Sequence, residues 1–133
     1  MSNVELIRSS ALADSAPYAY ASVVPAGRMV FTAGACPLDA RGNIVEPDDV
    51  AGQARQAMAN LVEALDAAGA GLTDVAKTTV YVASRWREDL VTAWNVVHEA
   101  FGDHDAPSTL VGVAVLGYPE QMVEVEAVAV IPS

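Results

Sequence analysis

The chain has 133 residues, of which 53% are hydrophobic, so it can bury the core of one compact domain but is too short for two. We therefore expect a single domain over residues 1–133. Its 17 acidic and 7 basic residues give a formal net charge of −10, which repels phosphate backbones and anionic lipid surfaces and argues against nucleic-acid and membrane binding. The N-terminus has no basic stretch that leads into an apolar signal core, which predicts a cytoplasmic protein.

The first part of the chain is predicted to be β-structure. Residues 4–8 can form a short strand. Residues 18–24 and 28–32 are expected to pair as a hairpin, because the intervening segment 25–27 contains proline and glycine and can turn.

A helix and another strand are predicted next. Asp48 and Asp49 offer an N-cap, apolar residues recur at helical spacing from position 50 to position 68, and glycines at positions 69 and 71 end the helix. Residues 75–83 are β-branched and alternate in character, which predicts a strand.

The last part of the chain is predicted to hold a helix and two strands. Ser84 can cap the helix, and Gly102 lies near its end. Its apolar stripe recurs at steps of four, three and four residues: Leu90, Trp94, Val97 and Phe101. Strands are expected at residues 109–115 and 122–131. The resulting order suits an α+β domain with both helices on one face of a sheet, and we expect a second copy of the chain to cover the other face.

Two carboxylates interrupt the otherwise apolar final strand. Glu124 and Glu126 are two residues apart, so they point to the same face of the sheet. If that face is solvated, the pair is only a polar edge. If a partner subunit closes it, either carboxylate becomes a candidate proton-transfer group.

Other chemically active residues have simpler interpretations. Cys36 would need contact with His98 or His104 to act as a nucleophile, and a small buried thiol is favoured instead. The loop at residues 102–105 matches no zinc or EF-hand spacing, so we expect a solvated polar loop and no metal site. Asn95 neighbours the apolar stripe of its helix and is either exposed or a placed hydrogen-bonding group.

Seven segments, in order along nearly the whole chain, carry a resemblance to a known family. They are Ala16–Tyr18, Val30–Gly34 with Pro37–Leu38, Gln53–Ala57, Asn60–Leu61, Ala67–Gly69, Val75–Val80 and Val123–Ala127. Together they resemble the RidA/YjgF family. The resemblance implies a chorismate-mutase-like fold, a homotrimer with a central β-barrel, and ligand clefts between subunits. It also implies hydrolysis of small imines and enamines, such as 2-aminoacrylate, to 2-oxo acids and ammonia without a cofactor.

The resemblance also implies a site, with departures. It assigns a water-activating glutamate, a cleft tyrosine, a helix asparagine and a backbone donor to Glu124, Tyr18, Asn95 and Gly34. Ala33 and Ala35 replace a hydroxyl residue and a glutamine of the family. The arginine that grips the substrate carboxylate is replaced by Ser108, or by Pro107 if the following loop is one residue shorter. Losing such a bidentate contact commonly weakens the binding free energy of the substrate by about 2–5 kcal/mol.

Two functions therefore remain in competition. The first is a hydrolase or deaminase whose small-molecule substrate differs from the 2-aminoacrylate type, with Glu124 as general base. The second is a non-catalytic binding or regulatory trimer, since the replaced residues are the polar groups that a ligand would use. Ribonuclease activity, known for some family members, is disfavoured by the negative charge.

Overall fold

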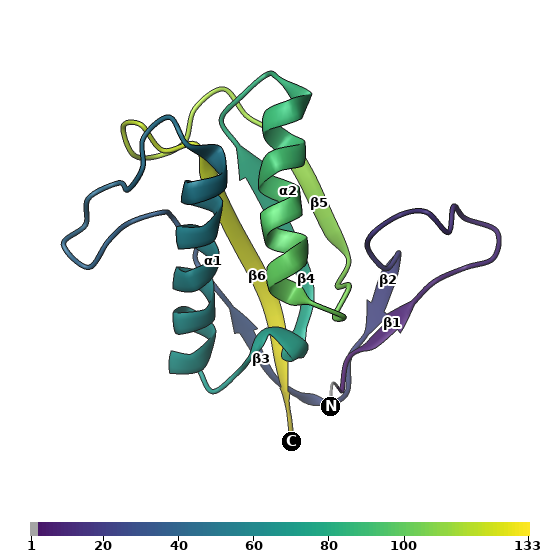
Figure 1. The fold of residues 1–133 in the computed structure, drawn as a ribbon. Helices are drawn as coiled ribbons and strands as arrows, with labels where there is room; N and C mark the ends of the chain where they lie inside the picture. The colour runs from purple at the N-terminus through teal and green to yellow at the C-terminus, as the bar shows by residue number, and fades with distance from the viewer. Residues whose placement is uncertain (1–2) are drawn as a thin grey trace.

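The structure is a computed structural model that describes residues 3–133, and it confirms the α+β class. Two helices lie across one face of a four-stranded sheet, and a short hairpin projects from the side (Figure 1). The elements, in chain order, are β1 (Glu5–Ile7), β2 (Ala21–Val23), β3 (Gly27–Phe31), α1 (Val50–Ala67), a 3₁₀ turn (Leu72–Asp74), β4 (Val75–Val82), α2 (Arg87–Phe101), β5 (Ser108–Gly112) and β6 (Val123–Pro132).

The sheet has the order β3-β6-β4-β5. Strands β4 and β5 are parallel, as expected for strands joined through a crossover helix, and the other pairs are antiparallel. Side chains on the inner face of β4 and β6 pack under α1 and α2, where Leu61 and Leu65 are fully buried. Within residues 3–133 no helix covers the other face, and its closure by a second copy stays a prediction.

The predicted hairpin between residues 18–24 and 28–32 is wrong. Strand β2 pairs with β1 in a separate two-stranded sheet, and β3 pairs with β6. Pro25, between β2 and β3, has no N–H for a ladder and fixes its own backbone, so the chain leaves one sheet and enters the other. The projecting hairpin is held on β4 by Ser22, whose Oγ donates to the carbonyl of Ala76 at 2.7 Å.

Helix α1 has the caps that its sequence predicts. The side chain of Asp49 accepts a hydrogen bond from the backbone N–H of Gly52 at 3.0 Å and satisfies one of the free donors of the first turn. At the other end Gly69 has φ +87°, the left-handed conformation that commonly terminates helices.

Helix α2 begins later than predicted. Ser84 is not its N-cap: the helix starts at Arg87, and Ser84 accepts from the backbone N–H of Trp86 and donates to Asp89. Strand β5 ends at Gly112, and not at residue 115, because Gly112 faces Val82, the last residue of its neighbour β4.

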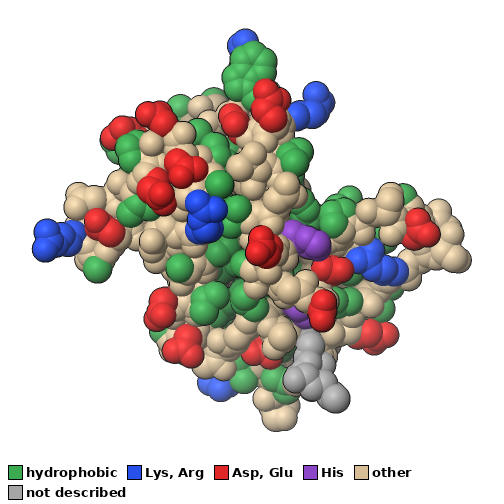
Figure 2. Space-filling model, viewed as in Figure 1, with side chains coloured by type: hydrophobic (Ala, Val, Ile, Leu, Met, Phe, Trp, Pro, Cys, Tyr) green, Lys and Arg blue, Asp and Glu red, His purple; other side chains and the backbone are tan. Residues whose placement is uncertain are grey.

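Neither helix combines the length and apolar character needed to cross a bilayer, as judged from the described residues 3–133. Acidic side chains are spread over the helical face, in keeping with the net charge of −10 (Figure 2). The histidine side chains lie where the projecting β1–β2 hairpin and its loop meet the rest of the molecule (Figure 2).

A buried amide joins α1 to the segment before β6. Gln53 is fully buried, and it donates to the carbonyl of Glu120 (2.9 Å) and accepts from the N–H of Met122 (2.7 Å).

We expect Gln53→Met to lower the free energy of unfolding by about 2 kcal/mol, because both backbone groups lose their partner. Urea unfolding followed by tryptophan fluorescence measures this change. Gln56→Met on the same helix is the control and should cost less than about 1 kcal/mol. Equal stability of the two variants would contradict the expectation.

Candidate functional site

Glu124 lies on the sheet face opposite the helices. Its neighbours in β6 are fully buried in the core, so its own side chain points the other way. There its Oε1 accepts hydrogen bonds from Cys36 Sγ at 3.3 Å and from Gln121 Nε2 at 3.1 Å. A Cβ atom on Gly34 would lie 2.1 Å from Oε2, so the carboxylate packs directly on the backbone of this glycine.

Backbone pairing brings Gly34 and Cys36 beside β6. The intervening Ala35 forms an antiparallel bridge with Val125, with N···O distances of 2.7 and 3.1 Å. From the other side, Asn60 of α1 donates to the carbonyls of Cys36 (2.8 Å) and Leu38 (2.9 Å). A strand and a helix therefore fix the segment that faces Glu124.

Gln121 is itself held in one orientation. It is 4% exposed, and its Nε2 donates to the carbonyl of Val123 (3.1 Å) as well as to Glu124. Its Oε1 accepts from the backbone N–H of Tyr118 at 3.1 Å. Both ends of the amide are occupied, so the donor that faces Glu124 is preorganised.

The thiol of Cys36 has two acceptors within reach, Glu124 Oε1 at 3.3 Å and the carbonyl of Gly34 at 3.5 Å, and the contact with Glu124 is the shorter one. Burial raises the pKa of its thiol to about 11, and the hydrogen bond to Glu124 and the carboxylate charge add to this rise. The thiol therefore stays protonated near neutral pH and is a poor nucleophile. The predicted small thiol is correct in this respect, but the residue is only half-buried and contacts the candidate general base.

Glu126 has a different environment from Glu124, although both point to the same face. The Tyr81 hydroxyl donates to Glu126 Oε1. This hydrogen bond, followed by burial, raises the pKa of Tyr81. The second carboxylate of the strand therefore has a structural partner.

A second group of predicted site residues lies around a cavity of about 510 Å³. The lining residues are Pro17, Tyr18, Trp94, Ser108, Thr109 and Leu110, and none of them is charged. The rings of Tyr18 and Trp94 meet edge to face with centroids 6.2 Å apart. Ser108 accepts a hydrogen bond from Thr78 at 2.7 Å and lines the cavity, whereas Pro107 is buried. Of the two positions expected to replace the arginine, Ser108 is the one that reaches a ligand-sized space.

One chain does not bring the two groups together. Ser108 pairs with Thr78 of β4, whereas Glu124 pairs with Tyr81, two strands and three residues away. With strands about 4.8 Å apart and residues about 3.3 Å apart along a strand, the Cα atoms of Ser108 and Glu124 are roughly 14 Å apart. Their side chains also lie on opposite faces of the sheet, since Thr78 is buried beneath α2.

Two other predicted site residues lie outside both groups. Asn95 is exposed on α2 and does not line the 510 Å³ cavity. Ala33 is exposed beside Gly34 and brings no hydroxyl. Of the two possibilities for Asn95, the isolated chain therefore has the exposed one.

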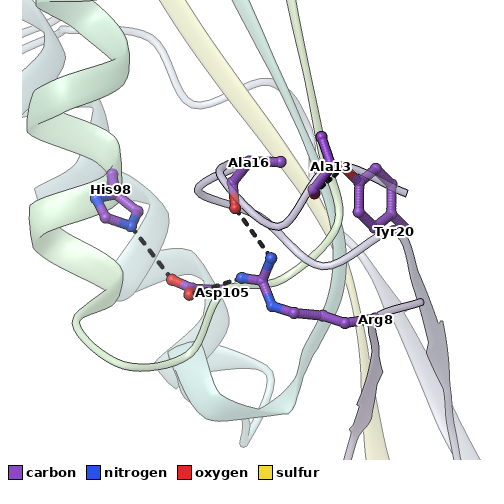
Figure 3. Close-up of polar contacts among 6 residues, drawn as sticks. All are labelled: Arg8, Ala13, Ala16, Tyr20, His98 and Asp105. Atoms are coloured by element: carbon purple, nitrogen blue, oxygen red, sulfur yellow. Dashed lines mark hydrogen bonds and ion pairs between the residues drawn. The ribbon is translucent and has the colours of Figure 1, made fainter. Parts of the chain in front are cut away.

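The prediction of a solvated polar loop at residues 102–105 is confirmed for the exposed Gly102 and Asp103 but wrong for the two residues that follow. His104 is 7% exposed, and its Nε2 lies 2.8 Å from the carbonyl of Val75. Asp105 contacts Arg8 (3.1 Å) and His98 (3.2 Å), as Figure 3 shows. No group of three or more His, Cys, Asp or Glu side chains among residues 3–133 is arranged to hold a metal ion.

The same contacts fix the segment that precedes Tyr18. Besides Asp105, the Arg8 guanidinium donates to the carbonyl of Ala16 at 2.9 Å, and the Tyr20 hydroxyl donates to the carbonyl of Ala13 (Figure 3). The loop between β1 and β2 is thereby closed on itself and attached to the start of β5.

Known proteins share this sequence and fold. The sequence model of the family described as endoribonuclease L-PSP matches residues 9–131. The 2-iminobutanoate/2-iminopropanoate deaminase of Salmonella typhimurium is 37% identical, over 84% of this chain and 86% of its own length. The chain belongs to the RidA/YjgF family.

Solved structures of similar proteins have the same architecture. A Yersinia pestis protein, described as a member of the conserved Rid family of unknown function, superposes with a TM-score of 0.91 at 30% identity and covers 97% of this chain and 99% of its own. Escherichia coli TdcF, solved with bound serine, has a TM-score of 0.68 at 34% identity over 87% of this chain and 89% of its own.

Sequence reasoning missed the residues that surround Glu124. Gln121 gave no motif, and its only signal is a position three residues before Glu124, in a segment rich in turn-forming residues. The sequence predicts histidine as the only reactive partner for Cys36, whereas the thiol lies against the carboxylate of Glu124.

Proposed function

We propose that this RidA/YjgF chain is a cofactor-independent hydrolase that deaminates a small imine or enamine, with Glu124 as general base. The observation that carries the proposal is the carboxylate of Glu124, held at Oε1 by two donors and packed on Gly34. Curated relatives at 37% identity are named 2-iminobutanoate/2-iminopropanoate deaminase. A general base has to be held within hydrogen-bond reach of the proton that it takes, and these contacts hold the Glu124 carboxylate in one position.

The reaction needs only water. Glu124 takes a proton from water while the oxygen forms a bond to the imine carbon, and the C=N electron pair moves to nitrogen. Glu124 returns that proton to the nitrogen, which gives a neutral carbinolamine. Glu124 then takes the hydroxyl proton as the C–O bond becomes a carbonyl and the C–N bond breaks, and it passes this proton to the departing nitrogen, so that ammonia leaves. In sum, an imine and water give a carbonyl compound and ammonia. The backbone N–H of Gly34 would polarise the substrate.

In this proposal the site closes between copies of the chain. Glu124 with Gly34 lies on the sheet face opposite the helices, and the cavity of Tyr18 with Ser108 lies at the β5 edge of the sheet, so each is half of a site. A homotrimer, which the family resemblance implies, would place half-sites of neighbouring copies against each other, and Tyr18 and Asn95 would orient the substrate. Light scattering measures this directly, and a monomer at micromolar concentration would contradict it.

The substrate is proposed to lack the α-carboxylate of 2-iminobutanoate. The residues that line the cavity have hydroxyl groups from Ser108 and Thr109 and aromatic surface from Tyr18 and Trp94, but none of them is a cation. The ammonium beside the lining, that of Lys77, donates to Thr109 Oγ1 at 2.7 Å and offers no bidentate contact. A carboxylate placed there would lose its hydration without a bidentate partner. A neutral imine with an apolar substituent fits such a lining better.

We expect purified protein to hydrolyse a carboxylate-free ketimine at least about 30-fold faster, in kcat/KM, than enzymatically generated 2-iminobutanoate.

Ser108→Arg should raise kcat/KM for 2-iminobutanoate by about 10-fold, because it restores a cation to the cavity, and Ser108→Gln is the uncharged control. Initial rates of ammonia release against the enzyme-free reaction measure both. Efficient turnover of 2-iminobutanoate by the unmodified protein would contradict the substrate assignment and leave the deaminase assignment standing.

The uncharged lining also favours a second candidate, a binding or regulatory trimer that performs no chemistry. Native mass spectrometry of gently purified protein separates the two. A metabolite that stays bound and unchanged favours the binding function, whereas its conversion to a carbonyl compound favours the hydrolase. The formal net charge of −10 disfavours the ribonuclease activity that the family description mentions.

A further inference from the structure

We propose that Cys36 and Gln121 are positioning residues for the Glu124 carboxylate: they hold Oε1 and leave Oε2 to accept the proton from water. This inference rests on the proposed role of Glu124 as general base. It assigns a function to two residues that neither touch the reacting atoms nor contribute charge.

The geometry of the two donors carries the inference. Both hydrogen bonds that the described residues make to the Glu124 side chain end on Oε1, at 3.3 Å from Cys36 and 3.1 Å from Gln121. Two donors on one oxygen oppose rotation of the carboxylate about its Cγ–Cδ bond. The other oxygen, Oε2, is directed at the backbone of Gly34, where a Cβ would be only 2.1 Å away. The donors therefore distinguish two oxygens that are otherwise equivalent.

Helix α1 supports both donors. Asn60 binds the carbonyl of Cys36 (2.8 Å), and Gln53 binds the backbone of the residue after Gln121, Met122, at 2.7 Å. Catalytic groups need a supporting shell that fixes their rotamers, and here the shell starts in the core of the domain. Both donors lie in connecting segments, Cys36 between β3 and α1 and Gln121 between β5 and β6, and these hydrogen bonds attach each segment to α1.

The chemistry of the two donors suits a base. A thiol and an amide are neutral, so they orient the carboxylate without compensating its charge, as an arginine or lysine would. Burial raises the pKa of Cys36 to about 11, so the thiol keeps its proton, and its ability to donate, throughout the neutral and mildly alkaline range.

Kinetics of three variants on the imine that the unmodified protein hydrolyses test the inference. Cys36→Ala and Gln121→Met should each lower kcat by about 10-fold and change KM by less than about 2-fold, because they misplace the base without touching the substrate. Cys36→Ser keeps a donor and should restore kcat to within about 3-fold of the unmodified protein. A Cys36→Ser variant as impaired as Cys36→Ala, or normal kcat in both Cys36→Ala and Gln121→Met, would overturn the inference.

The variant Glu124→Gln distinguishes a failure of the positioning role of Cys36 and Gln121 from a failure of Glu124 as general base. If Glu124→Gln is inactive while Cys36→Ala and Gln121→Met are normal, the positioning role is wrong and the base stands. If Glu124→Gln keeps full turnover, the base itself is wrong.

A second readout needs no substrate. Cys36 is the one cysteine of the chain, so the pH dependence of alkylation by iodoacetamide reports its thiol alone. Glu124→Gln should lower the pKa of Cys36 from about 11, because the carboxylate disfavours the thiolate, while burial keeps it above the ordinary 9.0. Gln121→Met should raise it, because the hydrogen bond from Gln121 favours the thiolate. An unchanged pKa in Glu124→Gln would overturn the contact on which the inference depends.

Discussion

Replacing Glu124 by Gln should lower kcat for imine hydrolysis by about 10²- to 10⁴-fold, the usual contribution of a general base. The amide has nearly the same shape as the carboxylate and can still accept the hydrogen bond from Gln121, but it cannot take a proton from water. We therefore expect an unchanged fold and almost unchanged KM with turnover lost. Steady-state ammonia release and a thermal melt measure the two properties on the same sample.

Glu126→Gln is the matched control for this experiment. It changes the same residue type on the same face of β6, two residues away, but Glu126 is engaged by Tyr81. We expect kcat within about 3-fold of the unmodified protein, which is the effect of a neutral hydrogen-bond change. The variant should also lower the pKa of Tyr81, since the bond to Glu126 is the main cause of its rise. Equal losses in both glutamine variants would contradict the special role of Glu124.

Gly34→Ala should also lower kcat, by about 10²-fold or more, through displacement of the base. The new Cβ would lie 2.1 Å from Oε2 of Glu124 and 2.4 Å from its Cδ, so the carboxylate must leave its place. The obstacle is a side chain and not backbone, so we expect the melting temperature to change little. The displaced carboxylate would also leave Cys36, whose alkylation near pH 9 should become faster.

Gly71→Ala provides the control for Gly34→Ala. No atom lies within 4 Å of the position of its Cβ, and its φ of −128° is accessible to alanine. Activity and stability should stay within the range of ordinary surface substitutions, about 0.5 kcal/mol. A Gly34→Ala variant with the turnover of Gly71→Ala would show that the Glu124 carboxylate does not need its position against this glycine.

Local patterns predicted the parts of the fold whose causes are local. Helix α1 has a capping aspartate and a terminal glycine within its own sequence, and β4 and β6 alternate where one face is buried. The strand with which β2 pairs is not determined by local sequence. Strands β1 and β3 are both short apolar candidates, and the choice between them depends on where the chain leaves Pro25.

The same distinction holds in the site. Glu124 could be predicted because a carboxylate in an apolar strand is unusual and the family resemblance gives it a role. Its contact with Cys36 joins residues 88 positions apart, and it exists because Ala35 bridges to Val125. No spacing rule connects such residues, so the contact between Cys36 and Glu124 can be found only in the three-dimensional structure.

The amides of α1 have a consequence for the way the site opens. Gln53 and Asn60 connect the helix to the two backbone segments that flank Glu124. Segments that share hydrogen bonds with a core helix open with it as one cooperative unit, at a free energy close to that of global unfolding. The acid of this protein is thus connected to a helix whose buried residues belong to the core, so opening the site also requires breaking contacts of that helix.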